Sequence, residues 1–146
     1  MHISVADRVT DELTGALQRL IPQLTSNHPP PTAGELAALI QGGTSRLLVA
    51  RIPDEGGPIV AALALVIYRV PTGLRAVIED VVVHEAARGG GVGEALVRRA
   101  LELARLAGAG GVALTSNPRR IAANRLYLRM GFVRRETNAY FYGFDA

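Results

Sequence analysis

The sequence contains no cysteine and no lysine, and aromatic residues make up only 5% of it. Without cysteine, disulfides, thiolate metal ligands and a cysteine nucleophile are excluded. Long apolar runs are also missing, since the longest, Ile59 to Tyr68, is about half the length of a membrane-spanning helix. The N-terminus lacks the basic start and apolar stretch of a secretion signal. These absences lead us to expect a cytoplasmic protein with no membrane partner.

The length and composition predict one folded domain over residues 1–146, because 49% of the residues are hydrophobic and 20% are charged. The formal net charge of +3 is modest, but the arginines are unevenly distributed. Ten of them lie between Arg88 and Arg135, where the only acids are Glu94 and Glu102. This half of the chain would attract a polyanion. One interpretation is that these arginines lie on solvated helix faces. The other is that some of them form a surface that binds a phosphorylated cofactor.

The spacing of apolar residues predicts secondary structure in the order βααβββαβαββ. Thr32 and Glu35 have the spacing of a capping box, and Asn117 and Pro118 are typical of a helix start. The second, third and fourth strands are expected to form an antiparallel meander. Helices are expected over residues 11–24, 33–41, 93–107 and 118–130. Strands are expected over residues 3–6, 45–52, 59–70, 74–84, 111–116, 132–135 and 140–144.

The most informative segment is a glycine-rich loop between a predicted strand and a predicted helix, Arg88-Gly-Gly-Gly-Val-Gly93. Its glycines allow backbone N–H groups to point into one concavity. The helix that follows begins without a Ser, Thr, Asp or Asn cap, so its first N–H groups need another acceptor. The helix dipole and Arg88 both favour an anion at this point. A pyrophosphate would satisfy all three features, and the alternative is a flexible turn without a ligand.

Two other phosphate-binding motifs do not fit this loop. A Walker loop requires a lysine, and the dinucleotide fingerprint requires a small residue where this sequence has Leu96. The pattern Arg88-x-x-Gly91-x-Gly93 instead resembles the acyl-CoA-binding signature of the GNAT superfamily, which reads Gln or Arg-x-x-Gly-x-Gly or Ala. The resemblance continues, in order and at similar spacing, through residues 79–83, 115–119, 123–127 and 131–132. It covers about residues 45–144.

The resemblance implies an α/β (α+β) fold of the GNAT, or acyl-CoA N-acyltransferase, type. Such a fold has a mixed, mostly antiparallel sheet of about six or seven strands flanked by about four helices. The implied activity is that of an acyl-CoA-dependent N-acetyltransferase, which uses acetyl-CoA as cosubstrate and no metal. The implied acceptor is a primary amine of a small molecule or peptide. The alternative is a catalytically silent GNAT-fold module that senses acyl-CoA.

The resemblance also implies which residues form the site. In this family the strand before the loop carries a bulge, and pantetheine lies beside it like an added strand. A backbone N–H at Val81 or Val82 would polarise the thioester carbonyl. The Tyr127 hydroxyl would be the general acid near the sulfur, although helical spacing alone favours a core aromatic there. The implied cofactor-binding residues are Val81, Val82, Val83, Arg88, Gly89, Gly90, Gly91, Val92, Gly93, Asn117, Asn124 and Tyr127.

Acyl transfer also requires that the acceptor amine lose a proton, because an ammonium has no lone pair. Glu79 and Asp80 are adjacent on a predicted strand, so they are expected to point to opposite faces of the sheet. The resemblance favours Glu79 as the general base, acting directly or through water; the alternative is that Glu79 only orients the substrate or has a structural role. Asp80 and His84 are weaker candidates, and His84 could equally be a turn residue. With no cysteine to form an acyl-enzyme, direct attack is expected.

The sequence says less about partners. Nucleic-acid binding by the arginine-rich half, with Tyr127, Tyr140 and Tyr142 as stacking groups, is the weaker alternative, because aromatics are few and no such motif is visible. The acceptor would be selected by the two N-terminal helices, the Pro53 to Pro58 loop and the final strands. The apolar segment Tyr140 to Phe144 is a candidate for pairing across a homodimer.

Overall fold

The computed structural model describes residues 1–145, and it divides into two compact units, Met1–Thr115 and Ser116–Ala146. The first unit contains β1 (His2–Val5), α1 (Asp11–Leu24), α2 (Ala33–Gln41), β2 (Ser45–Arg51), β3 (Ile59–Val70), β4 (Gly73–Val83), the short 3-10 helix η1 (Glu85–Ala87), α3 (Val92–Ala107) and β5 (Val112–Ala113). The second unit contains α4 (Ile121–Arg129). The prediction of one domain over residues 1–146 stays a prediction.

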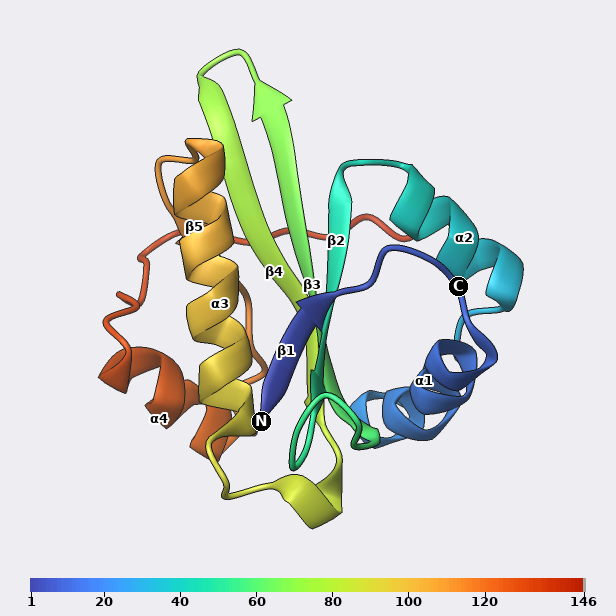
Figure 1. Cartoon of the computed structure of the whole chain (residues 1–146). Coiled ribbons are helices and arrows are strands. Elements are labelled where there is room, and N and C mark those ends of the chain that lie inside the picture. Colours follow the sequence, from blue (N-terminus) through green and yellow to red (C-terminus); the bar gives the residue numbers. More distant parts are fainter. Residues whose placement is uncertain (146) are drawn as a thin grey trace. The chain divides into compact units, whose positions relative to one another are not determined.

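The first unit is built on a five-stranded sheet in the order β1-β2-β3-β4-β5. The first four strands run antiparallel to their neighbours, which confirms the predicted meander, and β5 is parallel to β4. Figure 1 shows α3 on one side of this sheet and α1 and α2 on the other. The sheet is therefore covered on both faces, and its inner strands are rich in apolar residues throughout.

The two faces of the sheet contribute to different parts of the core. Val49 and Ala62 are register partners, and both pack with Leu13, Leu17 and the other core residues of α1 and α2. Leu48 and Leu63, the next pair along, are fully buried and point to the opposite face, which α3 covers. Because side chains alternate along the strands, one face of the sheet packs against α1 and α2 and the other packs against α3.

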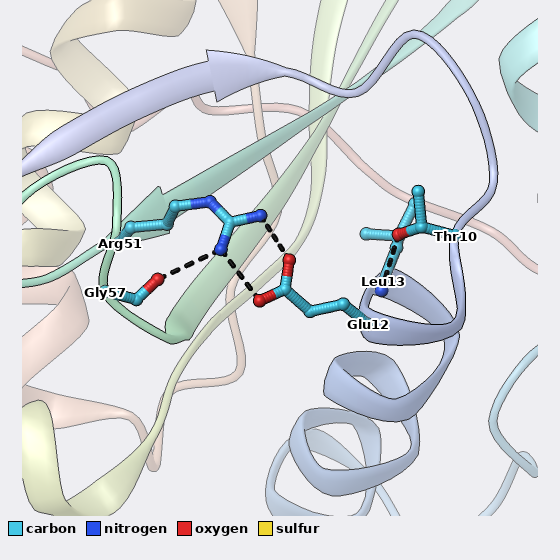
Figure 2. Close-up of polar contacts among 5 residues, drawn as sticks. All are labelled: Thr10, Glu12, Leu13, Arg51 and Gly57. Atoms are coloured by element: carbon cyan, nitrogen blue, oxygen red, sulfur yellow. Dashed lines mark hydrogen bonds and ion pairs between the residues drawn. The ribbon is translucent and has the colours of Figure 1, made fainter.

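The starts of α1 and α2 form as the sequence predicts. The Thr10 hydroxyl caps α1 by accepting a hydrogen bond from Leu13 N at 3.1 Å (Figure 2). In α2 the Thr32 hydroxyl accepts from Glu35 N at 3.1 Å, while the Glu35 carboxylate accepts from Thr32 N at 3.0 Å. The predicted capping box is confirmed, and α1 has the predicted bounds.

The second unit differs from the prediction at the start of its helix. α4 begins at Ile121 rather than directly after Asn117. The Asn117 side chain accepts from Arg119 N at 2.9 Å, and Asn117 O accepts from Arg120 N at 3.0 Å. These two bonds close a local turn, which is the alternative to helix that asparagine side chains favour. The expectation that Asn117 is the N-cap of α4 was wrong for this reason.

The strand count also falls below the expected six or seven. Within residues 1–145, the segments 132–135 and 140–144 contain no strand. A strand exists only where its backbone pairs with a neighbour, and apolar composition alone does not supply one. β5 is likewise shorter than the predicted 111–116, because its pairs with β4 are Ala76 with Val112 and Val77 with Ala113. The fold class stands as expected, with a smaller sheet.

None of the helices described in residues 1–145 combines the length and apolar character that a membrane crossing requires.

Candidate active site

The glycine-rich loop enters α3 through two left-handed glycines. Gly89 has φ +86° and Gly91, the N-cap of α3, has φ +80°, so a side chain at either position would be strained. A Cβ built on either residue would meet no atom within 4 Å, so the space beside both is open. The backbone is therefore accessible to a ligand on the side that a side chain would otherwise occupy.

The N-terminus of α3 has no side-chain cap within the described residues. Its helical bonding begins with Ala95 N donating to Gly91 O at 3.0 Å. The backbone N–H groups before Ala95 consequently have no acceptor within the helix, and they carry the positive end of its dipole. The predicted absence of a cap is confirmed, and the helix start has the features of an anion-binding site.

Two contacts hold the chain that leads into this loop. The Arg88 Nε donates to the carbonyl of Val83 at 3.0 Å, across the η1 turn. His84 Nδ1 accepts from Ala86 N at 3.0 Å, so His84 caps η1. The capping bond supports the interpretation of His84 as a turn residue. Arg88 keeps its terminal nitrogens for other partners while its Nε fixes the turn.

β4 contains a β-bulge directly before the loop. Ala62 pairs with Val82, but Ala64 pairs with Glu79, so the single residue between the alanines lies opposite both Asp80 and Val81. Asp80 adopts φ +52°, the one left-handed residue other than glycine in the described chain. An extra residue of this kind bends the strand and increases its local twist. The recorded β4–β5 pairs stop at Val77, before the bulge.

The bulge changes the way the two acidic candidates are presented. In a regular strand Glu79 and Val82 would point to opposite faces, because they are three residues apart. Instead, Glu79 pairs with Ala64, and Val82 pairs with Ala62. Glu79 and Val82 therefore lie on the same face of the sheet, the one that packs against α1 and α2. Glu79 and Asp80 are both exposed. The prediction that Glu79 and Asp80 point to opposite faces assumed regular alternation along the strand. The bulge interrupts this alternation at Asp80.

In the second unit, Asn117, Asn124 and Tyr127 are linked through α4. Asn124 Nδ2 donates to Asn117 O at 3.0 Å, so this side chain fastens the first turn of the helix to the segment before it. Tyr127 lies three residues further on and is buried, with 6% of its surface exposed. Its ring meets that of Phe132 edge to face, with centroids 5.7 Å apart. Tyr127 is therefore a packed aromatic that also carries a polar hydroxyl.

The environment of Tyr127 keeps its hydroxyl protonated. Burial raises the pKa of Tyr127 above its ordinary value of 10.0, and nearby Arg120 opposes this shift to a smaller extent. At neutral pH the group is therefore a proton donor and not a base. That is the protonation state a general acid must have.

One residue of this region could not be predicted from the sequence. The Gln23 side chain, in the last turn of α1, accepts from Glu85 N at 2.9 Å through Oε1. Its Nε2 donates to Arg19 O at 3.2 Å, which holds the side chain on the helix. Gln23 and Glu85 are 62 residues apart and belong to no common motif, so only the fold brings them together. Gln23 thereby ties α1 to the turn that precedes the glycine-rich loop.

Taken together, the first unit places Glu79, residues 81–83 and the glycine-rich loop in one continuous stretch around the β4 bulge. A helix start suited to an anion thus follows a bulged strand, which is the arrangement that the sequence resemblance led us to expect. Residues 13–132 match the profile of the acetyltransferase (GNAT) family. The chain belongs to this family.

Solved structures agree with this assignment. A candidate acetyltransferase of Agrobacterium tumefaciens is 27% identical and has a TM-score of 0.82, with 98% of this chain and 100% of that one covered. An acetyltransferase of Trypanosoma brucei is 26% identical, with a TM-score of 0.73 and coverage of 96% and 99%. Glucosamine-6-phosphate N-acetyltransferase of Arabidopsis thaliana shares the fold at 20% identity, with a TM-score of 0.79 and coverage of 99% and 100%. No curated protein sequence matches the chain.

Proposed function

We propose that this chain is an N-acetyltransferase that moves the acetyl group of acetyl-CoA to a primary amine of a small molecule or peptide by direct attack. Family membership supports the use of acetyl-CoA. The observation that carries the proposal is the start of α3, where uncapped N–H groups, open left-handed glycines and Arg88 adjoin one another. A pyrophosphate is the ligand whose charge and acceptor oxygens suit all three.

The residues present suit the rest of the cofactor as well. The N–H groups of Gly89, Gly90, Gly91, Val92 and Gly93 would hold the pyrophosphate, with Arg88 beside it. Pantetheine would pair with the backbone of residues 81–83, beyond the last β4–β5 pair. The Val83 carbonyl already accepts from Arg88 Nε, and a carbonyl oxygen has a second lone pair for another donor. Asn124, on α4, and Asn117, in the turn before it, would contact the cofactor arm.

Two side chains are assigned to proton transfer. Bound acetyl-CoA supplies the activated acetyl group as a thioester. Glu79, exposed on the α1 and α2 face of the sheet, would take the proton of the amine directly or through water. Tyr127, whose pKa is raised by burial, would donate a proton to the departing sulfur. The expected acceptor is a primary amine, because exposed carboxylates beside the site suit a cation.

Cofactor binding is tested first, by calorimetry with coenzyme A. Gly91→Glu and Gly43→Glu form a matched pair, because both glycines are left-handed, at φ +80° and +76°, with open space beside them. Both variants carry the same strain and the same added charge, but only Gly91 lies in the loop. We expect Gly91→Glu to abolish binding and Gly43→Glu to preserve it. Equal loss in both variants, or no binding by the wild type at millimolar coenzyme A, would refute the proposal.

Turnover is tested next, with a panel of primary amines. Release of coenzyme A can be followed by a thiol reagent without interference, because the protein has no cysteine. A control without amine corrects for hydrolysis. We expect at least one amine to give CoA release above hydrolysis. Tight CoA binding with no acceptor in the panel would favour the silent acyl-CoA-sensing module instead.

A further inference from the structure

The hairpin between β3 and β4 extends beyond its neighbours in the sheet. The register pairs of β2 with β3 end at Val66, and those of β5 with β4 begin at Ala76. Residues 68–75 therefore form a ribbon of two strands, which Figure 1 shows projecting past β2 and β5. A ribbon of two strands is only marginally stable by itself, so the stability of the fold does not account for its length.

The two faces of β3 and β4 beside this ribbon are covered differently within Met1–Thr115. The register pair Leu65 and Ile78 is buried on the face that α3 covers. The next pair, Val66 and Val77, points to the opposite face and is partly exposed. Neither valine belongs to the core that packs against α1 and α2. In the first unit, the packing of α1 and α2 on this face therefore ends before the two valines.

Three side chains of β4 follow one another along this face. Arg75, Val77 and Glu79 occupy alternate positions, and the register with β3 is regular as far as Glu79. Glu79 lies directly before the bulge, and Arg75 lies on the ribbon, about 14 Å away at the rise of a strand. Both of these charged residues are exposed. The strip of Arg75, Val77 and Glu79 therefore has a cation at one end, an anion at the other and an apolar middle.

The cation at the ribbon end of the strip has donors to offer. Arg75 Nη2 donates to the Thr72 hydroxyl at 2.9 Å, which holds the side chain on the ribbon. None of the salt bridges within residues 1–145 involves Arg75. A guanidinium has five N–H donors in a planar fork, and it can bind a carboxylate through two of them. Arg75 consequently keeps donors for an anionic group of a ligand.

We propose that this strip binds the acceptor, and that the acceptor is a peptide with its α-amine at Glu79 and an acidic side chain at Arg75. The inference rests on the proposed function, because Glu79 is the base proposed for the amine. The opposite charges of the strip match an ammonium and a carboxylate. An extended peptide rises about 3.3 Å per residue, so its fourth residue lies about 10 Å from the amine, and a glutamate side chain spans the rest.

A free amino acid and a polyanion both fit the strip less well. The amine and the carboxylate of an amino acid belong to one residue, so they cannot reach both ends of the strip. A polyanion such as RNA would place phosphates against Glu79 as well as against Arg75. Val66 and Val77, between the two charges, suit the intervening residues of a peptide when these are small or apolar.

The proposal is tested by CoA release with four peptides at saturating acetyl-CoA. Their sequences are Ala-Ala-Ala-Glu, Ala-Ala-Ala-Gln, Ala-Ala-Ala-Arg and Ala-Glu-Ala-Ala, each with an amidated C-terminus. We expect kcat/KM of the wild type for Ala-Ala-Ala-Glu to exceed that for Ala-Ala-Ala-Gln about fivefold, the upper range for an exposed ion pair. Ala-Glu-Ala-Ala should gain nothing over Ala-Ala-Ala-Gln, because its acid cannot reach Arg75.

Two arginines of the ribbon supply a matched pair of variants. Arg75→Glu should reverse the preference, so that Ala-Ala-Ala-Arg becomes a better acceptor than Ala-Ala-Ala-Glu. Arg69→Glu changes the net charge equally, but Arg69 is exposed on the opposite face of the ribbon, because its register partner is Leu74, the neighbour of Arg75. This control should keep the preference of the wild type.

The wild type alone keeps the proposal testable if Arg75→Glu does not fold. Its preference for the glutamate peptide should shrink as the salt concentration rises, because salt screens exposed charges. The proposal is overturned if the wild type lacks this preference, if salt leaves it unchanged, or if both variants alter it equally. A lower unfolding temperature of Arg75→Glu with an unchanged preference would also overturn it, since Arg75 would then bind its own chain.

The same assay separates this proposal from the proposed function. If another amine is acetylated but none of the four peptides is, the peptide acceptor is refuted and the acetyltransferase activity stands. If no amine gives CoA release above hydrolysis, the proposed function is refuted together with the acceptor.

Discussion

Arg51 holds Glu12 through both terminal nitrogens, with Nη1 2.9 Å from Oε2 and Nη2 2.5 Å from Oε1 (Figure 2). The same Nη1 donates to the carbonyl of Gly57 at 3.0 Å. This paired geometry is the strong form of an arginine–carboxylate contact. It joins the first turn of α1 to the end of β2 and to the loop that follows. Both α1 and that loop are elements that we expect to select the acceptor, and the contact holds the two together.

The Glu12–Arg51 pair predicts a pH dependence of stability. Its hydrogen bonds to Arg51 hold the pKa of Glu12 below its ordinary value of 4.5. Because the folded pKa is the lower one, the pair stabilises the fold above pH 4.5 and loses this contribution as pH falls through the lowered pKa. Glu12→Gln should therefore unfold at a lower temperature than the wild type near neutral pH, and this difference should shrink in acid. Thermal unfolding followed by circular dichroism at a series of pH values measures it, and a difference independent of pH would contradict the assignment.

Tyr127→Phe should lower kcat by about 10²-fold, the lower end of general acid catalysis, and leave the KM for acetyl-CoA nearly unchanged. The substitution removes only the hydroxyl, so the edge-to-face contact with Phe132 should persist and the fold should be retained. Tyr68→Phe, in β3, is the matched control and should keep full activity. Steady-state kinetics with a working amine decides between the two roles of Tyr127, since a core aromatic would tolerate the change.

The pH profile of kcat gives a second test of Tyr127. The protonated hydroxyl is the active form, and burial raises its pKa above 10.0, so the loss of this form moves to higher pH. We expect no alkaline decline from Tyr127 below about pH 10, and the residual activity of Tyr127→Phe should lack that decline altogether. An alkaline decline near pH 8 that disappears in Tyr127→Phe would conflict with the environment of this group.

Local signals made much of the fold predictable. The bounds of α1, the capping box of α2 and the bounds of β3 follow from apolar spacing and from side chains within a few residues, and the structure has them as expected. The two expected final strands and the length of β5 depended on pairing partners that no local pattern specifies. The predicted start of α4 was wrong for a different reason, because an asparagine such as Asn117 can cap a turn as readily as a helix.

The candidate site divides in the same way. The uncapped start of α3 and its left-handed glycines could be predicted, because the sequence shows directly where the glycines lie and that no capping residue precedes the helix. A bulge in this strand could be expected only from the family resemblance, and its position at Asp80 was not predicted, since no glycine marks it. The contact between Gln23 and Glu85 had no signal at all, because it depends on how α1 packs. Long-range geometry was therefore the part that required a structure.

Glu79→Gln tests the proposed base, with Asp80→Asn as its neighbour control. Asparagine tolerates the left-handed backbone of Asp80, so the bulge should survive in the control. We expect Glu79→Gln to lower kcat by about 10²-fold with little change in the KM for acetyl-CoA, and Asp80→Asn to stay within about twofold of the wild type. Both are measured by CoA release at saturating amine. If kcat is unchanged in Glu79→Gln, water and not Glu79 accepts the proton of the amine. An equal loss of kcat in both variants would indicate a shared electrostatic role.

Gln23 is expected to be a positioning residue for the glycine-rich loop. Its Oε1 fixes Glu85 N, and Glu85 opens the η1 turn that leads through Arg88 to the α3 start. Gln23→Ala should free this turn and raise the KM for acetyl-CoA about tenfold, while kcat at saturation stays within about twofold, because the reacting groups are not touched. Gln23→Glu should recover most of the loss, since a carboxylate can also accept from Glu85 N. A merely structural role would lower the unfolding temperature and leave the KM unchanged in both variants, so the ratio of the two KM values distinguishes the explanations.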